Sequence, residues 1–299
     1  MDNIKALTIT AVANMTSNYS ESLGNIASVQ KVFRNGRAYT IRSRESLKNA
    51  IMVQSGMYDD LQTEVDGAVQ KLVNKDLNAS NCRALEGGYL NTTGITNKRN
   101  SSFYVTDAIS CESFINETRF HNNLYMASNY ADKNNINIQE KAKECGLKPY
   151  QYEYDKSLKV YSLTIDLDMI GKDDNFKNEE GYMEADNKEK AERVNLLLSA
   201  VENLSLTVKG NLDNAEPVFV VGGLSDRKTH YFENVVKVED DKLIINSDLK
   251  AKLAKGYTVG MPESKVFKNE DEINKELVPV SLCEFFDNLR EQVKEYYNV

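Results

Sequence analysis

Apolar and polar residues alternate most clearly over residues 158–169, which predicts a strand with one face in the core. The large apolar residues of this segment share one face: Tyr161, Leu163, Ile165 and Leu167. The residues between them share the other face: Ser162, Thr164, Asp166 and Asp168. Shorter segments rich in β-branched residues predict further strands, at residues 4–14, 103–109, 217–221, 231–238 and 242–245.

Three segments show the apolar spacing of helices. After Ser43, a favourable N-cap, apolar residues recur at helical spacing and predict a helix to about residue 54. A second helix is expected over residues 187–203, and a third begins at a capping box formed by Ser281 and Glu284. The core order is then strand, helix, strand, strand, helix, strand. We therefore predict an α+β fold of the RRM-like (ferredoxin-like) type, an antiparallel sheet with two helices on one face.

Two polar segments interrupt this order. Residues 74–102 are rich in Asn, Ser, Thr and Gly without a sustained period, and so long a structureless loop is uncommon inside a compact domain. We expect this segment to be an insertion that protrudes from the core. Residues 171–190 are highly charged and are expected to be solvated. Residues 1–299 are expected to form one domain with insertions.

Composition limits the location and the class of the protein. The chain has no apolar run of transmembrane length, and its N-terminus, MDNIKALTIT, lacks a signal-peptide pattern. The four cysteines are scattered without a CxxC pair, so we expect a cytoplasmic protein without disulfides. The net charge of −8 argues against non-specific binding of nucleic acid by the whole surface. Any site for a polyanion must therefore be local.

One such local site is suggested by residues 31–44, KVFRNGRAYTIRSR, which contain five cations and no acid. Residues 31–41 are expected to extend into a hairpin arm, and the segment continues into the helix that starts at Ser43. A helix N-terminus offers free N–H groups and a partial positive charge, so Arg42 and Arg44 beside it favour a phosphate site. The alternative is a solvated basic loop before an ordinary helix.

The strongest enzyme-like signal is the pair Asp166 and Asp168. Two carboxylates at i and i+2 of a strand share a face and suit Mg²⁺ in phosphoryl chemistry, but alternation alone also places polar residues there. The sequence shows no P-loop, GxSxG, HExxH or Rossmann motif, and two histidines with scattered cysteines disfavour a zinc site. We therefore expect no metal and no cofactor. A ribonuclease or phosphotransferase that uses Asp166 and Asp168 is the alternative.

Five stretches of the chain together resemble a known family. They are KALTITAVAN, SVQKVFRNGRAYTIRSRESLKNAI, the polar insertion, FYVTDAISCESF followed by RFHNNLYM, and the late glycine-containing segment VVGGLSDRKTHYF. These are similar to the DevR-type backbone subunit of type I (I-B) CRISPR Cascade complexes, in the RAMP superfamily of RRM-like proteins. The resemblance covers most of the chain in element order, and its specific motifs are concentrated over residues 4–52 and around Gly222.

The resemblance implies a non-catalytic subunit of an antiviral effector. Family members polymerise head to tail along a CRISPR guide RNA, which pairs with a target DNA strand. The implied partners are the guide RNA, the target strand through that RNA, further copies of the chain and other Cascade subunits, with no membrane. The implied shape is a hand. Residues 74–102 are the candidate thumb, residues 112–155 the candidate finger, and residues 270–299 a C-terminal helix packed on the RRM-like palm.

The resemblance also implies RNA contacts at positions that match the motifs. The groove residues are Arg34, Arg37, Arg42, Ser43 and Arg44. Contacts from the insertions are Lys98, Arg99, Arg119 and His121, with Asn122 beside the last. Gly222 and Gly223 are expected to let RNA approach the backbone closely, and Arg227 and Lys228 to supply positive charge beside it.

Each of these positions has a structural alternative. A turn after a buried strand also explains the glycine pair, and a solvated loop also explains the cations of the polar insertion. A histidine beside apolar residues is often structural. The aromatic residues near the basic elements can stack on bases or line the groove: Phe33, Tyr39 and Tyr231.

A ribonuclease of the related type III kind is the other alternative. Those subunits cut target RNA with an aspartate in the loop after the first strand. Here that loop, NMTSNYSESLG, contains Glu21 as its only acid. This departure favours a subunit that does not cut.

Overall fold

The computed structural model describes residues 3–19, 26–66, 69–72, 77–91, 96–178 and 181–299. Its centre is an eight-stranded sheet whose three longest strands are β1 (Ala6–Thr16), β13 (Lys156–Asp166) and β18 (Pro217–Ser225). β1 lies between the other two and pairs antiparallel with both, so that Ile9 is opposite Leu163 on one side and Gly222 on the other. The remaining strands are β3 (Lys31–Arg34), β4 (Arg37–Arg42), β9 (Phe103–Val105), β10 (Ala108–Ser110) and β21 (Thr258–Gly260).

The order of these strands confirms the predicted RRM-like fold. The predicted first, second, third and fourth core strands are β1, β9 with β10, β13 and β18, and the sheet places them in the order fourth, first, third, second. The second core strand is divided, because Thr106 and Asp107 separate β9 from β10, and both pieces pair with β13.

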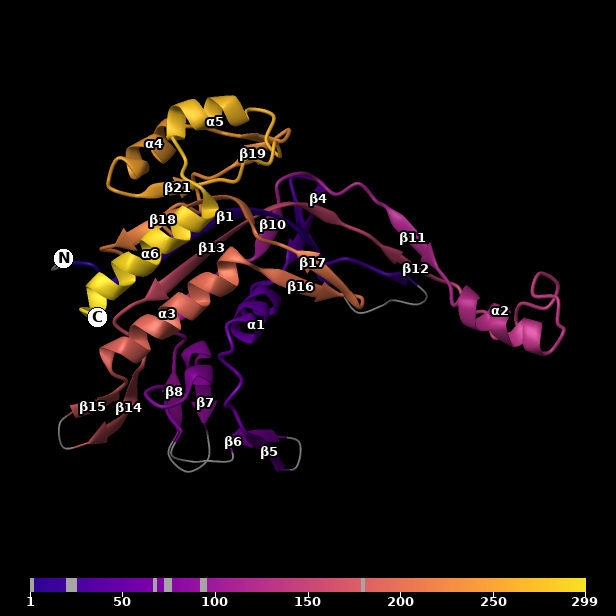
Figure 1. The fold of residues 1–299 in the computed structure, drawn as a ribbon, viewed down its shortest axis with the longest axis horizontal. Helices are drawn as coiled ribbons and strands as arrows, with labels where there is room; N and C mark the ends of the chain where they lie inside the picture. Colours follow the sequence, from indigo (N-terminus) through magenta and orange to yellow (C-terminus); the bar gives the residue numbers. More distant parts are fainter. Residues whose placement is uncertain (1–2, 20–25, 67–68, 73–76, 92–95, 179–180) are drawn as a thin grey trace.

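Helices α1 (Arg44–Gln54), α3 (Asn187–Glu202) and α6 (Leu282–Tyr297) cover one face of the sheet (Figure 1). Their apolar side chains form one cluster with alternate residues of β1 such as Leu7 and Ile9. The predicted helix starts are confirmed: the side chains of Ser43 and Ser281 accept hydrogen bonds from the backbone N–H groups of Ser46 and Glu284.

The opposite face is covered only in part, at its β18–β21 edge. Helices α4 (Ser247–Leu253) and α5 (Glu270–Leu277), with the short hairpin β19 (Val238–Glu239) and β20 (Lys242–Leu243), pack there on Phe219 and Val221. The strands expected at residues 231–238 and 242–245 are reduced to this hairpin, because the chain turns at Phe232–Val236.

The C-terminal segment differs from the single helix expected over residues 270–299. Ile273 of α5 belongs to the apolar cluster on one face of the sheet, whereas α6 packs on the other face. The chain crosses between the faces at Val278, a left-handed residue, and Val280, whose backbone pairs with β21. Helices α5 and α6 therefore pack on opposite faces of the sheet at this edge.

One arm extends far from the sheet (Figure 1). It consists of β11 (Thr118–His121), α2 (Leu124–Lys133) and β12 (Tyr150–Glu153), and β12 also pairs with β2 (Ile26–Ala27). At its tip α2 has a small apolar cluster with Ala127, Ala131 and Cys145. The candidate finger, residues 112–155, includes this whole arm.

Among the described residues, four further two-stranded hairpins complete the fold. The pair β16 (Ser205–Val208) and β17 (Asn211–Asn214) follows α3 directly. The other pairs lie together below the sheet in Figure 1: β5 (Thr63–Asp66) with β6 (Val69–Leu72), β7 (Tyr89–Asn91) with β8 (Asn97–Arg99), and β14 (Lys172–Asn178) with β15 (Gly181–Glu184). A 3₁₀ helix, η1 (Arg83–Gly87), precedes β7. The candidate thumb, residues 74–102, therefore contains η1 and the β7–β8 hairpin. Across the described residues, no helix combines the length and the apolar character needed to cross a bilayer.

Candidate nucleic-acid interface

The basic segment forms a tight hairpin. β3 and β4 are joined by Asn35 and Gly36, both with positive φ, as a two-residue turn between twisted strands requires. This turn places Arg34 directly opposite Arg37, and both side chains are exposed. Two cations therefore stand at the free end of the hairpin.

The same hairpin leads into the N-terminus of α1. Ser43 caps the helix and donates its own N–H to the side-chain oxygen of Asn18 at 2.8 Å. The backbone N–H of Arg44 donates to Asp107 Oδ1 at 2.7 Å, and the exposed Arg44 guanidinium lies 3.6 Å from Asp107 Oδ2. A carboxylate thus occupies the position where a helix N-terminus favours an anion.

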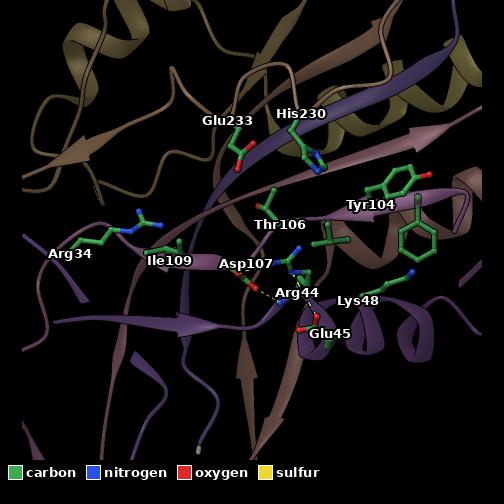
Figure 2. A pocket seen from close by; sticks show the side chains of 12 residues that line it. Arg34, Arg44, Glu45, Lys48, Tyr104, Thr106, Asp107, Ile109, His230 and Glu233 are labelled. Atoms are coloured by element: carbon green, nitrogen blue, oxygen red, sulfur yellow. Dashed lines mark hydrogen bonds and ion pairs between the residues drawn. The ribbon is translucent and has the colours of Figure 1, made fainter. Parts of the chain in front are cut away.

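Beside this helix terminus is a cavity of about 670 Å³ on the sheet face that α4 and α5 leave uncovered. Figure 2 shows Arg44, Lys48 and Asp107 on one side of it and His230 and Glu233 on the other. Arg34 reaches the same cavity from the hairpin. The cavity therefore joins the basic hairpin, the helix terminus and the open sheet face.

Several residues that line this cavity were not predicted from the sequence: Lys48, Tyr104, Thr106, Asp107 and His230. The one available signal was spacing, because Lys48 follows Arg44 by four residues on the same helix face. Lys48 Nζ donates to the backbone oxygen of Gly87 and lies 4.9 Å from the Phe103 ring centre. Burial lowers the pKa of Lys48.

His230 occupies the wall opposite α1. Its Nδ1 lies 2.9 Å from the hydroxyl of Thr164 on β13, which holds the ring against the sheet. Burial lowers the pKa of His230, and the nearby charge of Glu233 opposes this. The cavity is therefore lined by groups of both charges: Arg44 and Lys48 lie with Glu45 and Asp107 on the α1 side, and His230 lies with Glu233 on the other side.

Arg42 lies away from the expected groove. It is buried, and its guanidinium donates to the backbone oxygen of Thr16 at 3.0 Å and to the hydroxyl of Ser46 at 2.9 Å. Burial lowers the pKa of the Arg42 guanidinium, and the charge of Asp213 opposes this. In this arrangement Arg42 joins β1 to α1 and presents no group to a phosphate.

Arg99 is also buried. Its Nη2 lies 2.9 Å from Glu86 Oε2 and donates to the backbone oxygen of Met169, while Nη1 donates to Leu85. Arg99 thus fastens the β7–β8 hairpin to the core. Lys98, one residue earlier, is exposed beside a smaller cavity of about 340 Å³.

The glycine pair lies within β18, so the alternative of a turn after the strand does not apply. A Cβ at Gly222 would come within 2.3 Å of the backbone oxygen of Thr8, so this glycine permits β18 to approach β1. Gly223 packs against the ring of Tyr257 in the same way. Both residues are buried, and their close approach is to their own sheet.

The loop after β18 carries the two remaining cations of that region. Arg227 is exposed beside Asp226, with 3.7 Å between their charged groups. Lys228 instead reaches back to the end of β13 and pairs with both Asp166 and Asp168. In the described part of the chain, no group of three or more His, Cys, Asp or Glu side chains has an arrangement suited to a metal.

The predicted residues of the arm do not line the cavity. Arg119 and His121 are exposed on β11, while the side chain of Asn122 accepts a hydrogen bond from the backbone of Leu124 at the start of α2. Among the aromatic candidates, Phe33 is exposed on the β3–β4 hairpin, and Tyr231 stacks on Tyr257. Glu21 lies outside the described residues. The cavity thus brings together Arg34 and Arg44, and the other candidates are dispersed.

Comparison with known proteins gives two results. The model of a family described as CRISPR-associated negative auto-regulator DevR/Csa2 matches residues 7–244. Among solved structures, a chain of a CRISPR RNA-guided surveillance complex, pre-nicking, is similar with a TM-score of 0.57 and 10% identity, over 96% of this chain and 100% of that one. A chain of another CRISPR RNA-guided surveillance complex has a TM-score of 0.55 and 12% identity, over 96% and 99%. No curated protein sequence matches. At such low identity the structural similarity establishes the fold.

Proposed function

The chain belongs to the DevR/Csa2 family of CRISPR-associated proteins, and on that premise we propose that it is a backbone subunit that binds guide RNA in a Cascade effector. In this role many copies line one RNA, other Cascade subunits join them in the complex, and the exposed bases pair with a target DNA strand. The protein contributes contacts to the RNA backbone and performs no chemistry. Its place of action is the cytoplasm.

One observation carries this proposal. Arg34 of the β3–β4 hairpin, which lies opposite Arg37, meets Arg44 at the N-terminus of α1 at the edge of a single cavity, in a chain whose net charge is −8. Arg34, Arg37 and Arg44 are the phosphate contacts of this groove, with Ser43 orienting the helix terminus. Contacts of this type position a strand and carry no sequence information.

In the chain without RNA, the carboxylate of Asp107 takes the position that we propose for an RNA phosphate. Asp107 occupies the helix terminus in the chain alone, through the backbone N–H and the guanidinium of Arg44. A phosphate of the RNA displaces that carboxylate and recovers the same interactions. Lys98 on the candidate thumb, Arg119 and His121 on the candidate finger, and Arg227 extend the contact surface beyond the groove.

The decisive experiment is to purify the tagged chain from cells that carry a CRISPR array and the other subunits, and to sequence the RNA that accompanies it. Guide RNAs of uniform length support the proposal. A clean protein without RNA, or with random fragments, overturns it. The same purification from cells without the array is the control, because a general RNA-binding protein recovers fragments there as well.

A further inference from the structure

The arm carries an unusual group of side chains on one face of its two-stranded ribbon. β11 and β12 pair antiparallel, with Arg119 opposite Tyr152 and His121 opposite Tyr150. Because successive side chains alternate across a ribbon, these four residues share one face, which we call the ribbon face. Phe120, between Arg119 and His121, points to the other side.

The rings of the ribbon face are nearly parallel. The ring of His121 is 5.6 Å from that of Tyr150 at an angle of 24°, and 4.9 Å from that of Tyr152 at 28°. A hydrogen bond of 2.9 Å between the Tyr152 hydroxyl and His121 Nε2 fixes this arrangement. The guanidinium of Arg119 lies 3.3 Å from the centre of the Tyr154 ring, and this contact holds the Arg119 side chain beside the stacked rings.

These ordered groups are open to solvent. Tyr152 is the buried member of the ribbon face. Tyr150 is 52% exposed and the Arg119 side chain is 45% exposed. His121 is exposed as well. Arg119 keeps this exposure although it pairs with Glu117 at 3.1 Å. Side chains that are ordered without being buried have lost conformational entropy that no core contact repays. Such an arrangement is typical of a surface prepared for a ligand.

We propose that the ribbon face is a stacking platform for unpaired bases of a single nucleic-acid strand. Every base has a flat π-face, so parallel aromatic rings bind bases of any sequence, and a neighbouring arginine adds cation–π and phosphate contacts. The choice of a nucleic-acid occupant rests on the proposed function. The platform is a second contact, separate from the groove at α1, and the base comes either from RNA or from DNA.

The composition of the ribbon face favours bases over an apolar protein surface. It contains no aliphatic side chain, and two of its four members carry ring or guanidinium nitrogens. Further cations flank it: Lys148 is exposed two residues before Tyr150, and Lys209 lies 4.5 Å from the centre of the Tyr19 ring, which packs edge-on against Tyr152. Glu117, an exposed acid next to Arg119, opposes these positive charges.

The test measures binding of guide-length single strands to the full chain by fluorescence anisotropy. Tyr150→Leu removes the exposed ring and keeps apolar volume. The matched control is Phe120→Leu, an exposed aromatic residue on the opposite face of the same ribbon. Each protein is tested with an ordinary oligonucleotide and with an abasic one of equal length. We expect Tyr150→Leu to weaken binding of the ordinary strand roughly five- to hundred-fold, and Phe120→Leu to leave it unchanged.

The abasic strand separates stacking from phosphate contact. It is expected to bind the wild-type chain more weakly and to bind Tyr150→Leu equally weakly. A loss in Tyr150→Leu that persists on the abasic strand overturns the proposal, because the contact is then with phosphate. Strands of RNA and DNA with the same sequence, tested in parallel, show which source of bases the platform prefers.

A parallel titration of Arg44→Ala keeps this proposal distinct from the proposed function. Weaker binding by Arg44→Ala with normal binding by Tyr150→Leu overturns the platform and leaves the groove. No binding of either strand by the wild-type chain overturns both. Normal RNA binding by Tyr150→Leu with weaker self-association in sedimentation assigns the ribbon face to protein contact and overturns the platform.

A measurement on the unmodified chain covers the case in which Tyr150→Leu unfolds. Strands that carry 2-aminopurine lose fluorescence when that base stacks on an aromatic ring. Quenching on binding to the wild-type chain, relieved in His121→Gln, supports the platform. The proposal is overturned if fluorescence stays unchanged at saturating protein, wherever 2-aminopurine is placed in the strand.

Discussion

The ammonium group of Lys228 lies between the carboxylates of Asp166 and Asp168, 2.8 Å from Asp166 Oδ1 and 3.0 Å from Asp168 Oδ2. Burial acts against the charged form, but hydrogen bonds with Asp166 and Asp168 raise the pKa of Lys228. The ammonium therefore remains charged at neutral pH. It takes the place between the two carboxylates that Mg²⁺ would need for phosphoryl chemistry.

This pairing predicts how the chain responds to magnesium. Millimolar Mg²⁺ is expected to leave the Tm of the wild-type chain unchanged, because Lys228 already neutralises the carboxylates. Lys228→Ala is expected to lower the free energy of unfolding by about 1–2 kcal/mol. This is less than the loss of a fully buried ion pair, because Lys228 is partly exposed. Mg²⁺ then raises the Tm of this variant. A Tm increase in the wild-type chain that requires Asp166 would favour the metal-dependent alternative.

The groove predicts a salt-dependent loss in Arg44→Ala. A phosphate contact carries no sequence information, so the variant is expected to bind all RNA sequences more weakly, with a salt slope smaller by about 1. Lys255→Ala is the matched control, since Lys255 is an exposed cation after α4 that does not line the cavity. Equal salt slopes for Arg44→Ala and the wild-type chain would remove Arg44 from the RNA site.

The opposite change is expected at Asp107. Asp107→Asn keeps an oxygen that accepts the Arg44 N–H but removes the negative charge that competes with phosphate. RNA binding is expected to strengthen several-fold at low salt, and the gain should diminish at high salt, where screening weakens charge effects. Weaker binding by Asp107→Asn would assign this carboxylate a positive role in holding RNA.

A buried ion network predicts a large loss of stability in Glu86→Gln. Glu86 is fully buried, and its two oxygens lie 2.9 Å from Arg99 Nη2 and 2.8 Å from Arg193 Nη1. Removal of this anion leaves the buried Arg99 with an uncompensated charge, although Arg193 keeps its pair with Glu189 at 2.8 Å, and the loss is expected to be about 3–5 kcal/mol. Urea unfolding measures the loss, with the exposed Glu263→Gln as control. A loss below about 1 kcal/mol would show that the network is not needed to hold the β7–β8 hairpin.

The stability of the chain is expected to fall below pH 6.5 through His230. Burial lowers the folded-state pKa of His230 from its ordinary value of 6.5, with Glu233 acting against the shift. The unfolded chain therefore binds a proton at a higher pH than the folded chain does, so the contribution of His230 is complete above pH 6.5 and declines as the pH falls. Tm measured from pH 8 to pH 5 should show a decline that is smaller in His230→Gln. Parallel curves for the two proteins would contradict this.

Local sequence was sufficient for the elements that depend on near neighbours. The caps at Ser43 and Ser281 involve residues three positions away, and the alternation of β13 is a property of consecutive residues. The order of core strands and helices followed from these signals. The basic hairpin was visible for the same reason, since Arg34 and Arg37 are separated only by its turn.

Pairing between distant segments decided the rest. The alternation of β13 placed Thr164 and Asp166 on a polar face, and the structure buries them beneath His230 and Lys228, more than sixty positions later in the chain. The sequence left Gly222 and Gly223 open to a close approach of RNA or to a turn, yet the approach of β1 makes glycine necessary at Gly222 inside a strand. Neither environment has a local signature.

The sequence by itself determined the fold class, the helix starts and the place where positive charge gathers, because these depend on short-range spacing. Only the tertiary structure decided which cations remain available. Arg42 and Arg99 are turned inward by partners such as Thr16 and Glu86, while Arg34 and Arg44 remain exposed at the cavity. A charged side chain has the same sequence pattern whether it pairs inside or faces solvent, and the difference arises when the segments that contain its partners pack together.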